Sequence, residues 1–269
     1  MDLVQGIVLG LVQGLVEWLP LSSQAQVIAV SVAVFGSAPI DALNYSIFLH
    51  IGTLVAAAAY FRREIFGIAK AAVPALMQNQ KTKPAKPETA RLLVFMVIAL
   101  LATAITAIPT YLFLKQTFTN ATAGFVLLSM GVLLIATGAV QMVTKKTREA
   151  KTTKTNALIA GLGQGFSVLP GISRSGTTTS ILLFEGFRVE EALRLSFILS
   201  VPSVFAAEIM FGIAEQGAVA VDAGILAALA TAAIAGFASI SILMRVAKKI
   251  NFAWFCFLFG AVYVVMGLL

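Results

Sequence analysis

Six apolar runs of about 20 residues constrain this chain more than any other feature, because each is long enough to cross a bilayer core as a helix. Apolar residues make up 59% of the sequence and charged residues 12%, and the mean hydropathy is +0.95. Lipid is therefore the expected solvent, in which backbone groups must bond within helices. The sequence predicts an all-α integral membrane protein with about six transmembrane helices, at 42–61, 91–114, 120–143, 190–212, 222–246 and 251–268.

Two further apolar regions are broken near the middle. Residues 2–36 and 156–187 each contain a proline followed by hydroxyl residues, at Pro20 and Pro170. The break leaves arms that are mostly too short to cross alone, because proline cannot continue the hydrogen bonding of a helix. Each region is predicted to be a re-entrant helix-loop-helix hairpin that returns to its own side of the membrane.

The distribution of basic residues predicts the orientation in the membrane. With six crossings, one face holds 17 of the 19 Lys and Arg residues, in the loops at 62–91, 144–155, 188–194 and 245–250. Cytoplasmic loops carry the excess of Lys and Arg, so both termini are predicted to be extracytoplasmic. Membrane topology also explains the net charge of +7, and no nucleic-acid partner is expected.

The two halves of the chain resemble each other. GLVQG (10–14) recurs as GLGQG (161–165), each followed by Leu-Pro, and SIFLHIGT (46–53) aligns with SFILSVPS (196–203) at an offset of 150. The two hairpins are predicted to enter from opposite faces, so an inverted duplication explains the match better than chance similarity among apolar segments. The sequence therefore predicts a single membrane domain, 1–269, with inverted repeats at about 1–143 and 156–269.

The turn of the second hairpin, LPGISRSGTTTS (169–180), places one arginine among hydroxyl residues in an apolar region. A charge at membrane depth is costly unless it is paired or hydrated, so Arg174 is a functional candidate with an anionic partner. Its planar fork matches phosphate, and a helix beginning here offers free N–H groups. The predicted phosphate site also includes Ser173, Ser175, Thr177 and Thr178. The alternative is a structural arginine paired with an intramembrane glutamate, with serines as N-caps.

The first hairpin supplies the opposite charge. Gln13 and Glu17 are four residues apart on one helix face, just ahead of Ser22 and Ser23. If the hairpin tips meet, Glu17 comes within reach of Arg174 and can act as a metal ligand, a general base or a nucleophile. An ion pair that only joins the repeats is the alternative. N-capping explains at least one of the serines, and Ser23 is the candidate for a chemical role.

Two titratable residues in apolar segments lie outside any motif. His50 is the sole histidine. It can shuttle protons near neutral pH, but a hydrogen-bonded packing role is the simpler prediction. Glu208 also lies in an apolar run, and the sequence leaves its role open.

The segments QGLVEWLPLSS (13–23) and PGISRSGTT (170–178) resemble the two signature motifs of the undecaprenyl-diphosphatase family, the bacitracin-resistance membrane phosphatases. The resemblance implies removal of the terminal phosphate from undecaprenyl diphosphate, a polyprenyl lipid, which regenerates the carrier for cell-wall glycan synthesis. It implies an active site that faces the extracytoplasmic side and a divalent cation, Mg²⁺ or Ca²⁺. By the same resemblance Glu17 is the essential acid and metal ligand, with Gln13 as its variant partner, and Ser23 is the catalytic serine. The diphosphate pocket would include Ser173, Arg174, Ser175 and Thr178.

One position departs from the family pattern. The family continues the first motif as SSxGH, whereas this chain reads SSQAQ (22–26), with Gln26 where the resemblance places a catalytic histidine. Glutamine cannot take up or release a proton, so either the chemistry runs without that group or the activity is altered. Gln26 is predicted to contact the substrate. If proton transfer has merely been weakened, Gln26→His should raise turnover.

A second function fits the same pattern. Inverted repeats with broken helices are also the architecture of alternating access, so a lipid-phosphate flippase or an anion transporter is the alternative to a phosphatase. For the phosphatase, the attacking group is water or Ser23. The sequence leaves open whether the chain works alone or as a homodimer.

Overall fold

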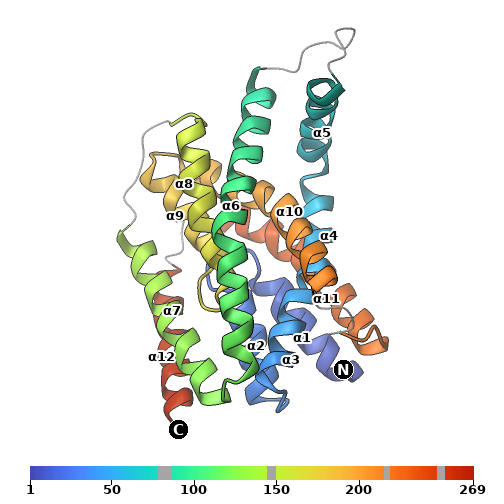
Figure 1. The fold of residues 1–269 in the computed structure, drawn as a ribbon, viewed down its shortest axis with the longest axis vertical. Coiled ribbons are helices and arrows are strands. Elements are labelled where there is room, and N and C mark those ends of the chain that lie inside the picture. The colour runs from blue at the N-terminus through green and yellow to red at the C-terminus, as the bar shows by residue number, and fades with distance from the viewer. Residues whose placement is uncertain (78–86, 144–149, 215–218, 247–251) are drawn as a thin grey trace.

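The computed structural model describes residues 1–77, 87–143, 150–214, 219–246 and 252–269. Within these ranges all regular elements are helices and no strand occurs. The α-helices are α1 (Leu3–Val16), α2 (Ser23–Ala33), α3 (Pro39–Phe48), α4 (His50–Tyr60), α5 (Arg62–Met77), α6 (Pro87–Thr119), α7 (Ala123–Val143), α8 (Lys154–Gly165), α9 (Arg174–Phe184), α10 (Val189–Ala214), α11 (Ala223–Val246) and α12 (Ala253–Leu268). Figure 1 shows both chain termini at one end of the molecule and α5 at the other.

Five helical segments of the described residues are long and apolar enough to cross a membrane: Pro39–Tyr60, Pro87–Thr119, Ala123–Met142, Val189–Ala214 and Ala223–Arg245. Large apolar side chains such as Phe113 and Ile234 are 66% and 74% exposed, as a lipid-facing surface requires. The prediction of an all-α integral membrane protein is confirmed. The sixth predicted span, 251–268, corresponds to α12, which has only 16 residues, and residue 251 lies outside the described ranges.

The span predicted at 42–61 consists of two helices. α3 begins at Pro39, whose fixed φ suits the first turn of a helix, and ends at Phe48. Leu49 separates it from α4, which begins at His50. The sole histidine therefore lies at a helix junction rather than in the middle of a regular helix.

The first predicted hairpin contains two short helices joined by a turn. Asp2 caps α1 by accepting the Gln5 backbone N–H at 2.8 Å, and α1 ends at Val16. Pro20 prevents the helix from continuing through the turn. Ser22 has a φ of 58°, in the left-handed region that few residues other than glycine adopt, and α2 begins directly after it. The turn is thus sharp enough to bring the start of α2 beside the end of α1.

The second predicted hairpin is built in a similar way. α8 continues as a 3₁₀-helix at Phe166–Val168, and α9 begins at Arg174. Gly171 lies in the turn with a φ of 105°, and a Cβ there would lie 2.6 Å from the Met130 carbonyl oxygen, so the position requires glycine. Ser173 caps α9, as the sequence suggested for a serine of this turn. Re-entry of either hairpin into the membrane remains a prediction.

Small residues allow the first arm of each hairpin to lie close to a spanning helix. On α1, a Cβ at Gly10 would lie 2.4 Å from the Ala228 carbonyl oxygen of α11. On α8, a Cβ at Gly161 would lie 2.2 Å from the Ala99 carbonyl oxygen of α6. Such close approach is the usual means of helix association in lipid, where the hydrophobic effect does not drive it. Equivalent glycines of the two GLxQG segments therefore make equivalent contacts, while the inverted duplication itself remains a prediction.

Candidate active site

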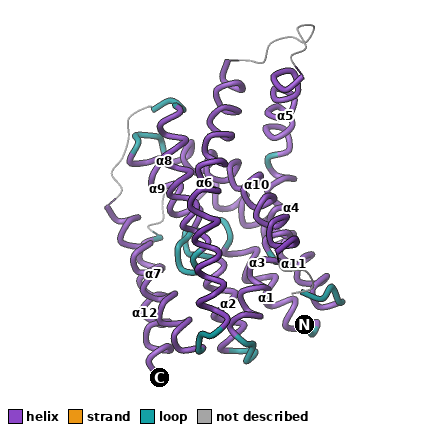
Figure 2. The backbone as a smooth tube through the Cα atoms, in the orientation of Figure 1, coloured by secondary structure: helices purple, strands orange, loops and turns teal. Residues whose placement is uncertain are grey.

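The tips of the two hairpins contact each other in the middle of the molecule, where Figure 2 shows their teal loops between the helices. The Gly171 backbone N–H donates to Ser22 Oγ at 3.0 Å, and Ser175 Oγ donates to the Leu19 carbonyl oxygen at 3.2 Å. Ser22 occupies the N-cap position of α2 but makes no capping hydrogen bond. Its hydroxyl joins the two hairpins instead.

Glu17 lies at this contact and is 5% exposed. Its Oε1 accepts a hydrogen bond from the Arg174 guanidinium. Its Oε2 accepts hydrogen bonds from Gln13 Nε2 at 2.8 Å and from Ser23 Oγ at 2.5 Å. These donors replace the water that a buried carboxylate loses, and Arg174 balances its charge. The structure thus brings together four residues that the sequence singled out.

Helix ends supply all three of the central groups. Glu17 directly follows α1, Ser23 is the first residue of α2, and Arg174 is the first residue of α9. The contact between the two proline-containing turns brings these helix ends together.

His50 completes the cluster, although the sequence favoured a packing role for it. Its Nδ1 lies 2.7 Å from the Ser46 carbonyl oxygen and 3.2 Å from that of Ile47. Its Nε2 lies 3.4 Å from Glu17 Oε2. The signal in the sequence was its isolation as the single histidine in an apolar span, but no local pattern connects position 50 with position 17.

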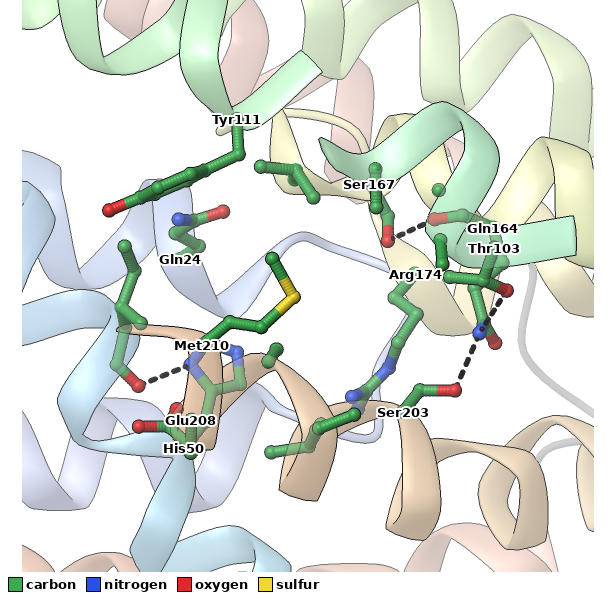
Figure 3. A pocket seen from close by; sticks show the side chains of 18 of the residues that line it. Gln24, His50, Thr103, Tyr111, Gln164, Ser167, Arg174, Ser203, Glu208 and Met210 are labelled. Carbon is green, nitrogen blue, oxygen red and sulfur yellow. Dashed lines mark hydrogen bonds between the residues drawn. The ribbon is translucent and has the colours of Figure 1, made fainter. Parts of the chain in front are cut away.

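A cavity of about 290 Å³ opens onto this cluster (Figure 3). Its polar lining includes Glu17, Ser22, Ser23, Gln24, His50, Thr103, Gln164, Ser167, Arg174, Ser175, Ser203 and Glu208. Its apolar lining comes mainly from α6 and α10 and includes Leu101, Ala104, Ile108, Val204, Ala207 and Phe211. The cavity therefore offers charged groups for an anion and apolar walls for a hydrocarbon chain in one space.

The hydroxyl residues of the second motif have different positions. Ser175 lines the cavity, as does Arg174. Ser173 accepts the Gly176 N–H as the cap of α9, and Thr178 Oγ1 donates to Gln164 Oε1 at 3.3 Å. The described residues that line the cavity do not include Ser173, Thr177 or Thr178. The candidate phosphate contacts of this motif are therefore Arg174 and Ser175, whereas the hydroxyls of Ser173 and Thr178 bond other groups of the protein.

Gln26 also lies outside the cavity lining. Its Nε2 donates to the Leu21 carbonyl oxygen at 3.3 Å, and its Oε1 accepts a hydrogen bond from the Tyr263 hydroxyl. It is 7% exposed and connects α2 to α12. The structure thus places Gln26 outside the cavity lining, bonded to Leu21 and Tyr263, and its contact with the substrate stays a prediction.

Replacing Gln26 by His is therefore expected to leave the pH dependence of turnover unchanged and to lower stability by about 1 to 3 kcal/mol, because the Tyr263 hydroxyl loses its buried acceptor. Thermal unfolding in detergent and a pH profile of activity measure the two effects. Tyr263→Phe is the matched control, since it removes the same hydrogen bond from the other side. A gain in turnover with a new pH limb would instead support proton transfer at position 26.

A second glutamine, which the sequence did not single out for the site, mirrors Gln13. Gln164 Nε2 donates to Ser203 Oγ at 2.9 Å, and Gln13 Nε2 lies 3.4 Å from Thr53 Oγ1. Thr53 and Ser203 are aligned at the offset of 150, and the two glutamines hold the same place in the GLxQG segments. The internal similarity of the sequence was the signal that could have identified Gln164.

A divalent cation fits this set of groups if its ligands come partly from the substrate. The described residues contain no group of three or more His, Cys, Asp or Glu side chains that could hold a metal ion by themselves. Cations of phosphate-transferring sites commonly use one or two carboxylates together with phosphate oxygens. Glu17 provides the carboxylate, and Gln13 Oε1 is a buried acceptor for which no hydrogen-bond partner is found. Glu17 and Gln13 are the residues that would hold the cation.

Comparison with known proteins identifies the family. The family model described as "Bacitracin resistance protein BacA" matches residues 6–262. The chain belongs to the BacA family. Proteins of Methanothrix thermoacetophila, Methanococcoides burtonii and Haloarcula marismortui, each named undecaprenyl-diphosphatase, are similar to it, with identities of 36%, 35% and 37%. The matches cover 97%, 98% and 98% of this chain and 96%, 98% and 96% of those proteins.

The BacA match and the helices agree on the class of protein. The match includes most of the first hairpin, all of the second and every residue of the cavity lining named above. With five helical segments suited to crossing a bilayer in the described residues, this BacA-family chain is a multi-pass membrane protein. The resemblance that the two motifs carried is confirmed over nearly the full length.

Proposed function

We propose that this chain removes the terminal phosphate from undecaprenyl diphosphate or a similar polyprenyl diphosphate in the membrane. The observation that carries the proposal is the meeting of Glu17, Ser23 and Arg174 in a cavity whose other walls are apolar side chains of α6 and α10. The related proteins named undecaprenyl-diphosphatase support hydrolysis over transport. The product would be the monophosphate carrier used in cell-wall glycan synthesis.

Arg174 binds the diphosphate in this proposal. Its side chain lines the cavity, is 16% exposed and bonds Glu17 through one guanidinium nitrogen. A guanidinium has five N–H donors, so those not used by Glu17 are free to bond phosphate oxygens in the planar geometry that they match. Ser175, next along α9, adds a hydroxyl on the same side of the cavity. Two adjacent residues of the second motif, Arg174 and Ser175, thus bind the phosphate.

Glu17 and Ser23 transfer the proton. The Ser23 hydroxyl points at Glu17 Oε2 over 2.5 Å, so this oxygen can accept the proton as a new bond to phosphorus forms. Either Ser23 Oγ or a water held by these two groups attacks the terminal phosphorus. The bond from phosphorus to the bridging oxygen breaks, and the lipid monophosphate leaves. With water as the attacking group, phosphate is released directly; with Ser23, water then hydrolyses the phosphoserine ester, which releases phosphate and restores the hydroxyl. A divalent cation, when bound, supplies positive charge against the diphosphate oxygens.

The proposed orientation places both termini and the opening of the site on the extracytoplasmic side. The bias of Lys and Arg toward the opposite loops supports this orientation. Both termini also lie at the same end of the molecule, away from α5 (Figure 1). A cysteine introduced at the N-terminus of this otherwise nearly cysteine-free chain, combined with Cys256→Ser, would report the side by labelling with a membrane-impermeant thiol reagent.

The function is tested by two assays on the purified protein. Release of phosphate from a polyprenyl diphosphate is measured in detergent with a divalent cation, and transbilayer movement of the same lipid is measured in vesicles. We expect phosphate release in the first assay. The phosphatase function does not require lipid movement in the second. Lipid movement in vesicles with no phosphate release in either setting would establish the transport alternative instead.

Replacing Ser23 by Ala is expected to lower turnover by about 100-fold, the scale of a lost proton-transfer contact. Acid quenching with substrate labelled in the terminal phosphate then separates the two attacking groups. Label bound covalently at position 23 identifies Ser23 as the nucleophile, and its absence in an active enzyme identifies water. Ser22→Ala is the matched control, because the neighbouring hydroxyl bonds the Gly171 backbone rather than Glu17.

A further inference from the structure

Gln24 is a buried polar residue of the cavity whose side chain has no partner within the described ranges. It is the second residue of α2, it lines the cavity, and it is 8% exposed. No hydrogen bond joins its side-chain amide to another described residue. A buried amide without a partner costs about 1 to 3 kcal/mol, so this position favours a ligand in the cavity that bonds it.

Other polar groups of the lining are already bonded within the protein. Ser167 Oγ donates to the Gln164 carbonyl oxygen at 2.6 Å, and Ser203 Oγ donates to the Leu199 carbonyl oxygen at 2.8 Å. Gln164 also uses its side-chain amide, whose Nε2 donates to Ser203 Oγ at 2.9 Å. The Gln24 amide differs from these groups because its two N–H donors remain available to a ligand.

The first turn of α2 adds backbone donors beside Gln24. The first hydrogen bond of this helix runs from the Gln26 N–H to the Ser22 carbonyl oxygen at 3.2 Å, so the N–H groups of residues 23–25 have no acceptor within the helix. Ser22 is the N-cap residue, but its side chain does not cap them and instead accepts the Gly171 N–H. These N–H groups and the helix dipole both favour an anion at this end of α2.

Gln24 holds the position in the first repeat that Arg174 holds in the second. The two residues align at the offset of 150, as do Ser23 and Ser173. Both side chains line the cavity, and Figure 3 shows them on different sides of it. The helices α2 and α9 thus each bring their first turn and one N–H-rich side chain to the same space. A ligand with two phosphates matches these two helix starts.

We propose that Gln24 and the first turn of α2 bind the phosphate that stays on the lipid, while Arg174 binds the phosphate that is removed. This inference rests on the proposed function. Ser23 and Arg174 both bond Glu17, so the phosphate under attack lies on their side of the cavity. The lipid-side phosphate then needs a second set of donors, and Gln24 provides it.

The proposed site makes Gln24 a specificity residue for diphosphates. A lipid monophosphate held by Gln24 leaves no phosphate at Arg174 to be attacked, whereas a diphosphate occupies both positions. A neutral amide holds a phosphate less tightly than a second arginine would, because hydrogen bonds from charged donors are about twice as strong. The monophosphate product can therefore leave after each turnover.

The site is tested with farnesyl methylenebisphosphonate, a prenyl diphosphate analogue that cannot be hydrolysed, and with farnesol, which has the chain but no phosphate. Affinities for the purified full-length protein are measured by titration calorimetry in detergent. Gln24→Ala is expected to weaken binding of the bisphosphonate by about 10- to 100-fold, the scale of a lost hydrogen bond to a charged group. Gln24→Glu has the same shape and should weaken it at least as much, since a carboxylate repels the phosphate. Farnesol should bind all three proteins equally.

Thermal unfolding of the free protein separates this role from a structural one. Because the Gln24 side chain bonds no described residue, Gln24→Ala should leave the melting temperature of the free protein unchanged. Gln5→Ala is the matched control, since it removes a glutamine that does not line the cavity, and it should change neither affinity. A lower melting temperature for Gln24→Ala together with unchanged binding would make Gln24 a packing residue.

Two further outcomes would overturn the site. Unchanged affinity for the bisphosphonate in both Gln24 variants would show that the residue does not bind phosphate. An equal loss of affinity for farnesol would place Gln24 against the hydrocarbon chain. Phosphate release is assayed separately, because binding of the analogue requires no turnover. Hydrolysis with a KM that Gln24→Glu does not change refutes only the Gln24 site, whereas Gln24-dependent binding without hydrolysis refutes only the proposed function.

Discussion

Replacing Arg174 by Lys is expected to lower turnover by about 30- to 1000-fold, corresponding to about 2 to 4 kcal/mol of transition-state stabilisation. Lysine keeps the charge but loses the planar fork that reaches Glu17 and the phosphate oxygens together. Arg174→Ala should lose at least as much, and it also leaves Glu17 buried without its cationic partner. Phosphate release under saturating substrate measures both variants.

The control for Arg174 is another arginine of an ion pair. Arg194 bonds Glu64 at 3.2 Å, both side chains are more than one-third exposed, and neither lines the cavity. Arg194→Lys should therefore change turnover less than about twofold, because exposed pairs contribute little. Near-normal activity of Arg174→Lys would show that only charge matters at position 174 and would contradict bidentate binding of the diphosphate.

Replacing Glu17 by Gln is expected to lower turnover by about 100- to 10,000-fold, because the amide cannot accept the proton of Ser23 or bind a cation strongly. The side chain keeps its shape, so the protein should still fold. The melting temperature should nevertheless fall, since Arg174 loses a charged partner and Gln13 Nε2 and the new amide compete as donors.

The measurements for Glu17 are phosphate release as a function of metal concentration and thermal unfolding in detergent. Glu64→Gln is the matched control, because it removes a carboxylate from an exposed ion pair outside the cavity. If Glu17→Gln retained hydrolysis with an unchanged metal titration, Glu17 would be only the ion-pair partner of Arg174, the alternative that the sequence allowed.

Properties that depend on short stretches of chain could be predicted from the sequence. Hydropathy over about 20 residues gives the spanning helices, since the thickness of the bilayer fixes their length. Pro20 and Pro170 mark the breaks in the two hairpins because proline interrupts a helix wherever the chain goes afterwards. Arg174 and Glu17 stand out because a charge in an apolar segment is costly in any fold. The family motifs cover these same residues.

The sequence alone determined the all-α membrane class, the breaks of the two hairpins and the opposite charges at their tips. Only the tertiary structure decided that His50, from the α3–α4 junction, lies against Glu17, and that Gln26 turns instead to Tyr263 on α12. Both contacts join positions whose separation in the chain follows no helical period, and they depend on how the helices pack. Helix packing in lipid is set by many weak contacts between small residues, such as those of Gly10 and Gly161, which no short segment of sequence specifies.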